Sequence, residues 1–73
     1  MKRRLGGRVK VNLCRLGIYS FMIVRFGPFG IFSVPAIHKD IDKPTSYDAG
    51  DRVRFRLIRL RGLVRAVDLK HTA

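Results

Sequence analysis

Arginine and apolar residues alternate along residues 52–57, and this pattern constrains the fold more than any other feature of the sequence. Val53, Phe55 and Leu57 occupy every second position, and arginines fill the positions between them. Successive side chains of a β-strand point to opposite faces, so this spacing predicts a strand with one apolar and one charged face. Residues 8–13 show the same alternation and predict a second strand of this kind, with its valines on one face.

Further short segments, rich in β-branched and aromatic residues, complete the expected set of strands: residues 18–26, 29–34 and 63–69. We expect Pro35 to end the second of these and residues 38–51 to form a polar loop. The alternation slips after Leu57, where Ile58 follows it directly, and this slip predicts a β-bulge. The sequence therefore predicts an all-β fold, a small five-stranded barrel, because closure hides the sheet edges. Another small barrel of five or six strands is the alternative.

The length and composition fit one small domain. The chain has 73 residues, of which 47% are hydrophobic, too many for a disordered chain. We expect a single domain over residues 7–70, preceded by a flexible basic arm at residues 1–6. A lone cysteine, Cys14, excludes an intrachain disulfide, and this favours a reducing, cytoplasmic location.

The charge is strongly one-sided. Sixteen Lys and Arg residues against five acidic residues give a net charge of +11. The field of such a chain attracts polyanions, so an anionic partner is the first functional hypothesis. The apolar stretch at residues 16–38 contains Arg25 near its middle and several glycines and prolines. These residues argue against a membrane span, and we expect no membrane partner.

A series of short motifs follows in order along residues 7–69: Gly7-x-Val9-Lys10, Tyr19-Ser20-Phe21-Met22, Ile31-Phe32-Ser33-Val34, Ala36-Ile37, Gly50 with Val53 and Phe55, and Arg65-Ala66-Val67-Asp68-Leu69. This series resembles the cold-shock domain family, whose members are OB-type barrels that bind single-stranded nucleic acid. The second and third motifs resemble the two ribonucleoprotein motifs of that family. The chain departs from the family pattern at Val11, Asn12, Ser20 and Val34, where Trp, Phe, Gly and His are usual.

The resemblance implies a binding face with aromatic and basic side chains. Tyr19, Phe21 and Phe32 would share the outer surface of neighbouring strands and stack on unpaired bases. The other interpretation of these rings is that they belong to the core. The cations expected to neutralise phosphates beside the rings are Arg8, Lys10 and Arg25.

A second set of arginines either extends this nucleic-acid track or forms a separate docking face: Arg52, Arg54, Arg56, Arg59 and Arg61. Arginine makes planar contacts with carboxylate and phosphate, so this face suits an acidic protein or ribosomal RNA. The leading hypothesis is binding of single-stranded RNA or DNA, in regulation of transcription or translation or as an RNA chaperone. The alternative is a small basic regulator that docks on a protein assembly such as RNA polymerase or the ribosome.

Catalytic and metal-binding patterns are weak in this sequence. No spacing of a nucleophile and its base is identifiable, so we expect no enzymatic activity and no cofactor. His38, Asp40 and Asp42 have side chains that can bind cations, but Lys39 and Lys43 flank them. We therefore interpret this segment as a polar loop and expect no metal site.

Overall fold

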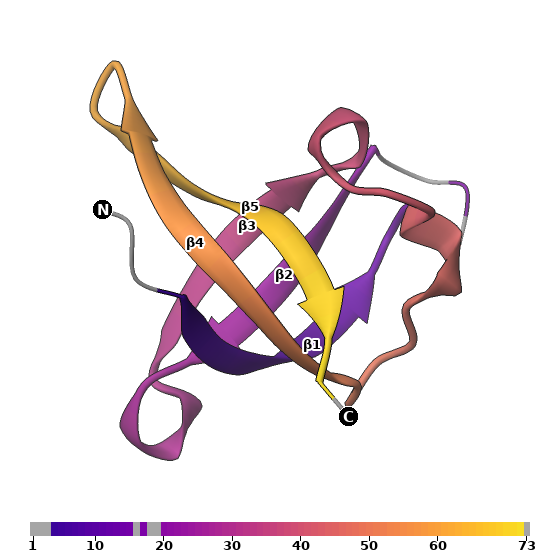
Figure 1. Cartoon of the computed structure of the whole chain (residues 1–73), viewed down its shortest axis with the longest axis horizontal. Coiled ribbons are helices and arrows are strands. Elements are labelled where there is room, and N and C mark those ends of the chain that lie inside the picture. Colours follow the sequence, from indigo (N-terminus) through magenta and orange to yellow (C-terminus); the bar gives the residue numbers. More distant parts are fainter. Residues whose placement is uncertain (1–3, 16, 18–19, 73) are drawn as a thin grey trace.

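The chain forms an all-β, closed barrel, as the alternating sequence predicts. The computed structural model describes residues 4–15, 17 and 20–72. Its strands are β1 (Leu5–Asn12), β2 (Phe21–Phe26), β3 (Phe32–Ile37), β4 (Arg52–Leu60) and β5 (Leu63–His71). They close in the order β1-β2-β3-β5-β4 (Figure 1). Strand number, order and closure are those of a small OB-type barrel.

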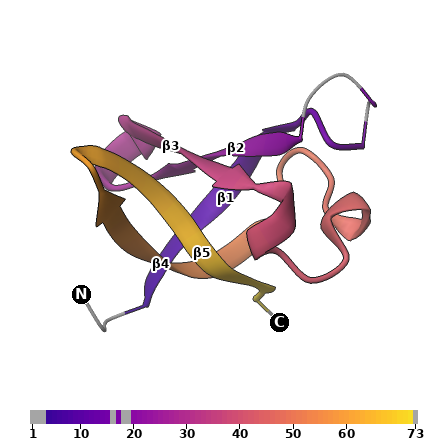
Figure 2. The same ribbon diagram turned by 90° about the horizontal axis from the view of Figure 1, so that it is seen from above.

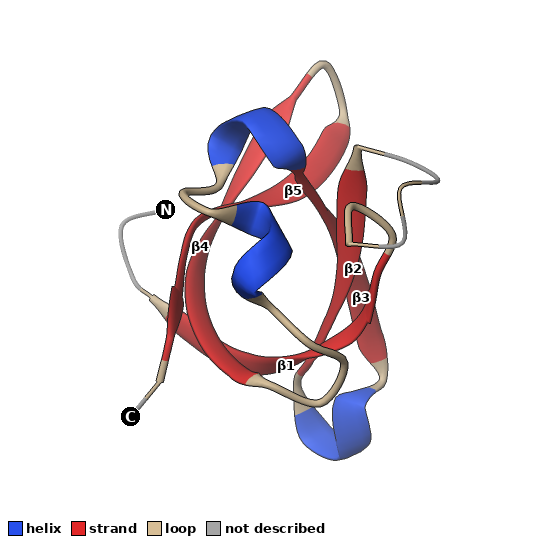
Figure 3. Cartoon of the chain, turned by 90° about the vertical axis from the view of Figure 1, so that its right-hand side faces the viewer, coloured by secondary structure: helices blue, strands red, loops and turns tan. Residues whose placement is uncertain are grey.

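The connections contain short 3₁₀ turns and, in the described residues, no α-helix. These turns are η1 (Pro28–Gly30), η2 (His38–Asp40) and η3 (Pro44–Ser46). The polar segment 38–51 is a long connection, as predicted, and η2 and η3 lie across one opening of the barrel (Figure 3). The β4–β5 hairpin turn projects on the opposite side (Figure 2).

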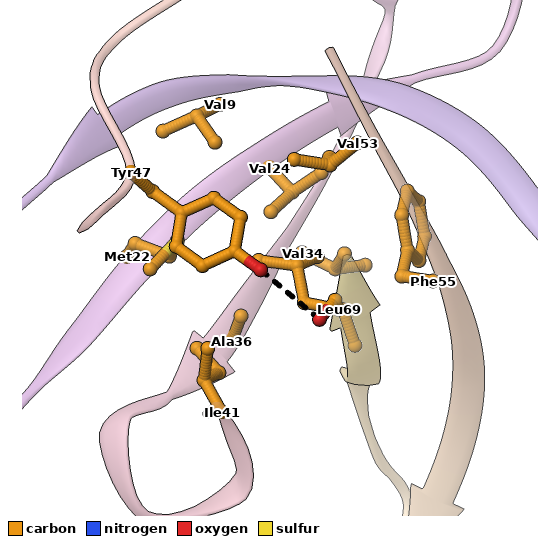
Figure 4. Packing of buried hydrophobic residues seen from close by; sticks show 11 residues of the cluster. Val9, Met22, Val24, Val34, Ala36, Ile41, Tyr47, Val53, Phe55 and Leu69 are labelled. Atoms are coloured by element: carbon orange, nitrogen blue, oxygen red, sulfur yellow. Dashed lines mark hydrogen bonds between the residues drawn. The ribbon is translucent and has the colours of Figure 1, made fainter. Parts of the chain in front are cut away.

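The core consists of the inward side chains of all five strands and of the long connection (Figure 4). Its members are Val9, Met22, Val24, Val34, Ala36, Ile41, Tyr47, Val53, Phe55, Ala66 and Leu69. The ring of Phe55 is fully buried and contacts Phe26 edge-on, with 5.5 Å between ring centroids. The Tyr47 hydroxyl donates a hydrogen bond of 3.1 Å to the Leu69 carbonyl. The core therefore ties the long connection to the last strand.

Several strand boundaries differ from the prediction. The strand expected at residues 29–34 begins only at Phe32, because Phe29 lies in the 3₁₀ turn η1. Pro35 lies inside β3, opposite Ile23 of β2, and does not end the strand. On its other side β3 meets β5 at the Ala36–Ala66 pair, so a proline beside that pair interrupts little of the ladder. At the N-terminus β1 begins at Leu5, inside the predicted flexible arm, because Leu5 pairs with Phe55.

A bulge in β1 reverses the faces of its last residues. Val9 lies opposite Val24, but Val11 lies opposite Ile23, so Lys10 is an extra residue in the ladder. Val11 therefore turns to the outer surface with Ile23. The prediction that both valines of this strand share one face is wrong for this reason.

The second bulge lies on β5 and not near Leu57. Arg54 pairs with Lys70 and Arg56 with Val67, which leaves an extra residue on β5, where Asp68 has a φ of 59°. Pairing continues from there to the end of the hairpin without a further shift. The apolar residues after Leu57 therefore face outward where the hairpin projects from the barrel, which accounts for the slip in the alternation (Figure 1).

Asn12 fixes the long connection against β1. Its side chain is buried and donates hydrogen bonds of 2.8 Å to the carbonyls of Pro44 and Tyr47. Its Oδ1 accepts hydrogen bonds from the backbone N–H groups of Cys14 and Arg15. One amide thus satisfies polar groups of two chain segments.

Asn12→Ala is expected to lower the free energy of unfolding by about 2 kcal/mol, because buried carbonyls lose their donors. Urea denaturation followed by circular dichroism measures this change. The control is Ser46→Ala, which removes an exposed hydroxyl that donates to the Lys43 carbonyl. Equal effects of the two substitutions would contradict the role of Asn12.

Candidate nucleic-acid interface

Three arginines lie side by side on the outer surface of neighbouring strands. Arg8 of β1 is directly opposite Arg25 of β2 on one side and Arg52 of β4 on the other. The next row of the same surface places Arg54 opposite Lys70. Like charges at directly opposed positions destabilise a sheet. Packing therefore gives no reason for this arrangement, whereas an anionic ligand would stabilise it.

A cleft of about 650 Å³ extends over this arginine row. Its lining consists of Gly6, Gly7, Arg8, Arg25, Phe26, Gly27, Phe29, Gly30, Arg52, Val53, Arg54 and Thr72. Gly6 has open space where a Cβ would lie, so the floor of the cleft is accessible backbone. At Gly7 a Cβ would collide with the Arg25 carbonyl oxygen, so this glycine allows β1 and β2 to approach closely.

No carboxylate of the described residues lines this cleft, and four of the five form ion pairs with other cations. Their ion pairs join Asp68 to Arg4 and Arg56, Asp48 to Arg15, Asp40 to Arg65 and Asp51 to His71. Within the described part of the chain, the four cleft arginines have no carboxylate partner; Arg8 donates only a long hydrogen bond of 3.4 Å to the Gly50 carbonyl. The cleft is therefore a concentration of uncompensated positive charge.

An aromatic ring stands at the edge of the cleft. Phe29 is fully exposed, and its backbone has a φ of 58°, a left-handed conformation that costs a non-glycine residue about 1 kcal/mol. The turn is held by a hydrogen bond of 3.0 Å from the Gly30 N–H to the Gly27 carbonyl. A strained turn that holds a ring in solvent beside four arginines suits stacking on a base.

The rings predicted for the site are not brought together. Phe21 is half-buried opposite Ile37, whereas Phe32 lies opposite Phe26, five residues along β2 and on the other side of the sheet. The ring of Phe32 is 51% exposed, but it packs against Phe26 at 5.4 Å between centroids, on the inward face of β2. The prediction that Phe21 and Phe32 share an outer surface is therefore wrong. Tyr19 lies outside the described residues.

The predicted basic residues are regrouped by the barrel. Arg8 and Arg25 lie together as predicted, and Lys10 is an exposed bulge residue of the same strand as Arg8. The predicted arginine ladder divides into three parts. Arg52 and Arg54 line the cleft, the Arg56 Nε pairs with Asp68 at 3.0 Å, and Arg59 and Arg61 lie at the end of the hairpin.

The sequence analysis missed Phe29, and it left open whether the second arginine set extends the first. The strand order of an OB-type barrel places the first strand beside the fourth, which would have joined Arg8 to Arg52. The Gly27–Gly30 turn also carried a signal, because a phenylalanine inside a Gly-Pro-x-Gly turn has little chance of burial.

No protein-family model, curated protein or solved structure matches this chain. Its function is therefore inferred from its own cleft and surfaces.

The described residues offer few other groups that could bind a metal ion or react. They contain no group of three or more His, Cys, Asp or Glu side chains placed to hold a metal ion. Cys14 is half-buried, and burial raises the pKa of its thiol. Burial also raises the pKa of the Tyr47 phenol, with a smaller contribution from nearby carboxylates.

Among the residues that the structure describes, no helix has the length and apolar character needed to cross a bilayer.

Asp51 anchors the turn that leads into β4. Its carboxylate accepts a hydrogen bond of 2.8 Å from the Asp48 N–H and lies 3.1 Å from the His71 Nε2. The backbone hydrogen bond, followed by the His71 contact, lowers the pKa of Asp51 below its ordinary value of 3.8. A lowered pKa means that this carboxylate stabilises the fold above pH 3.8, and that the stabilisation is lost as the pH falls through the native pKa.

Asp51→Asn is accordingly expected to reduce stability at pH 7 and to have a diminishing effect as the medium becomes more acidic than pH 3.8. Urea midpoints measured between neutral and strongly acidic pH test this. Asp42→Asn, at an exposed position, is the control and should leave the urea midpoint at pH 7 close to the wild-type value. A pH-independent effect of Asp51→Asn would contradict the assignment.

Proposed function

We propose that the chain binds single-stranded RNA or DNA, without catalysis, through the cleft over β2, β1 and β4. The observation that carries this proposal is the row Arg25–Arg8–Arg52, which lacks carboxylate partners in the described residues and lies beside the exposed ring of Phe29. The OB-type barrel supports it, because this architecture is a frequent platform for oligonucleotides. So does the resemblance of the sequence motifs to the cold-shock domain family.

The cleft is displaced from the usual binding face of such barrels, which is centred on the second and third strands. Here most of the outer side of β2 and β3 carries half-buried, mainly aliphatic residues, and Arg25 at the end of β2 is its one cation: Phe21, Ile23, Pro35 and Ile37 are the half-buried members. Most of the positive charge lies one strand further around the barrel. We therefore place the nucleic-acid backbone on β1 and not on β3.

In the proposed mode, phosphates lie along the arginine row and a base stacks on Phe29. Neighbouring strands are about 4.8 Å apart, so three arginines on successive strands extend over about 10 Å. The accessible glycine backbone at Gly6 allows the ligand to approach the sheet closely. Both contacts are independent of base identity, which suits an RNA chaperone or a regulator of transcription or translation.

Fluorescence anisotropy with a labelled single-stranded 12-mer, RNA or DNA, tests the proposal. Four phosphate contacts would give a slope of log affinity against log salt of about −3, which is roughly a 50-fold loss between 50 and 200 mM salt. A duplex of the same sequence should bind more weakly, since its bases are not available to stack. Absence of binding at about 50 mM salt, or equal affinity for anionic lipid vesicles, would contradict the proposal.

Phe29→Ala separates stacking from charge. We expect affinity to fall by about 5- to 150-fold, the equivalent of about 1–3 kcal/mol per stacked base, while the salt slope remains unchanged. Ile31→Ala is the matched control, because Ile31 is also exposed on this connection but does not line the cleft. If both variants bind like the wild type, Phe29 has no part in binding.

A further inference from the structure

A second hollow, of about 380 Å³, lies between the projecting hairpin and the outer side of β3. Its lining is mainly apolar, with two arginines: Pro35, Ile37, Leu60, Arg61, Leu63, Val64 and Arg65. None of these residues lines the basic cleft. We call this hollow the hairpin groove. It is a separate surface whose role is not explained by nucleic-acid binding.

The groove exists because the hairpin leaves the barrel. Among the described residues, β3 and β5 pair in parallel at Ala36 and Ala66. Beyond this pair β4 and β5 continue together to Leu60 and Leu63, and they diverge from β3 (Figure 1). The two walls of the groove therefore belong to different elements, and the space between them is built into the fold.

The leucines at the end of the hairpin are unusually accessible. Leu60 is 54% exposed and Leu63 is 76% exposed, and the two are paired across the turn. Solubility favours polar residues at such a position, and a cluster of exposed apolar groups marks an interaction surface. The apolar surface continues onto β2, where Ile23 lies opposite Pro35.

The charges around the groove indicate the chemistry of its occupant. Arg61 lines the groove next to the leucines and, among the described residues, has no carboxylate partner. The Arg65 Nε lies 3.4 Å from the Asp40 Oδ2, yet neither atom makes a hydrogen bond. A second copy of this chain would bring another net charge of +11 to this surface, which repulsion disfavours. A nucleic acid would leave the leucines uncovered.

We propose that the hairpin groove binds an acidic peptide segment of a partner protein. An apolar side chain of the peptide packs between Leu60, Leu63 and Pro35, and its carboxylates pair with the arginines that line the groove, first with Arg61. The docking face predicted along the arginine ladder is thereby limited to the end of the hairpin. Its partner is an acidic peptide with apolar side chains. The inference does not depend on the nucleic-acid cleft.

Three labelled peptides of equal length test the proposal by anisotropy and by ¹H–¹⁵N chemical-shift mapping. The first alternates leucine or phenylalanine with Asp and Glu, the second has lysine in place of the acids, and the third has serine in place of the apolar residues. We expect the first to bind at least about 10-fold more tightly than the others, because only it offers both apolar burial and opposite charge. Its shifts should centre on Leu60, Leu63 and Ile37.

The double variant Leu60→Ser/Leu63→Ser should lower affinity for the first peptide at least about 10-fold, since exposed anchors are removed without loss of core packing. Affinity for a single-stranded 12-mer should stay within about twofold of wild type, because the basic cleft is elsewhere. Equal binding of the serine peptide, or shifts confined to the Arg8 and Arg25 region, would overturn the proposal. A leucine-dependent dimer in sedimentation equilibrium would also overturn it, in favour of a second copy.

Discussion

Replacing Arg8, Arg25 and Arg52 by glutamine is expected to weaken binding to a single-stranded 12-mer by roughly 100-fold at about 100 mM salt. Each phosphate contact of a single strand contributes about −0.7 to the salt slope, so the slope should become shallower by about 2. Stability should not fall, because the three arginines repel one another across the ladders in the free protein. Anisotropy titrations at several salt concentrations, with urea denaturation in parallel, measure both effects.

The matched control removes the same charge elsewhere. Lys39, Arg59 and Arg61 are exposed and do not line the cleft, and glutamine at these three positions also lowers the net charge by three. This variant should lose less than about 10-fold in affinity, because long-range attraction is screened over about 10 Å at this salt concentration. Equal losses in the two triple variants would mean that net charge, and not the cleft, determines binding.

Phe55→Ala is expected to unfold the protein at 37 °C. Phe55 is fully buried at the centre of the core, and truncating a buried phenylalanine costs about 3–5 kcal/mol. A domain of this size rarely has more than about 3–5 kcal/mol of stability to lose. Circular dichroism and the disappearance of a cooperative urea transition measure the effect.

A milder substitution keeps this prediction testable. Phe55→Leu preserves most of the apolar volume and should cost roughly 1–2 kcal/mol, which leaves a folded chain with a lower urea midpoint. Phe29→Ala, at a fully exposed ring, should leave the midpoint unchanged. A Phe55→Ala variant with the wild-type midpoint would show that the core is not centred on this ring.

The barrel itself was predictable because side-chain alternation is a local signal. Val53 and Phe55 are buried and Arg52 and Arg54 are exposed, as the period of two requires. The faces of Val11 and Phe32 were not predictable in this way. An unpaired residue at position 10 reverses the pattern in β1, and nothing local distinguishes that lysine from its neighbours.

The candidate cleft depends on contacts between distant parts of the chain. Arg8 and Arg52 are 44 positions apart and become neighbours when β4 pairs with β1 to close the barrel. Individually, each arginine was a reasonable candidate for an anion contact. Only the register of the ladders shows that Arg52 and Arg54 lie on the same surface as Arg8. Arg56, on the same strand, forms an ion pair with Asp68.

The short junction of β3 with β5 has a consequence for motion. Elsewhere the barrel is joined by long antiparallel ladders, but here two alanines meet in parallel and contribute little side-chain contact. Separation of β3 from β5 breaks fewer interactions than separation of any other strand pair. Amide hydrogens near Ala36 and Ala66 should therefore exchange with solvent sooner than those of β1. The Ala36–Ala66 junction lies next to the hairpin groove, whose walls are β3 and the β4–β5 hairpin. A peptide bound in the groove would contact both walls and would therefore oppose separation of β3 from β5.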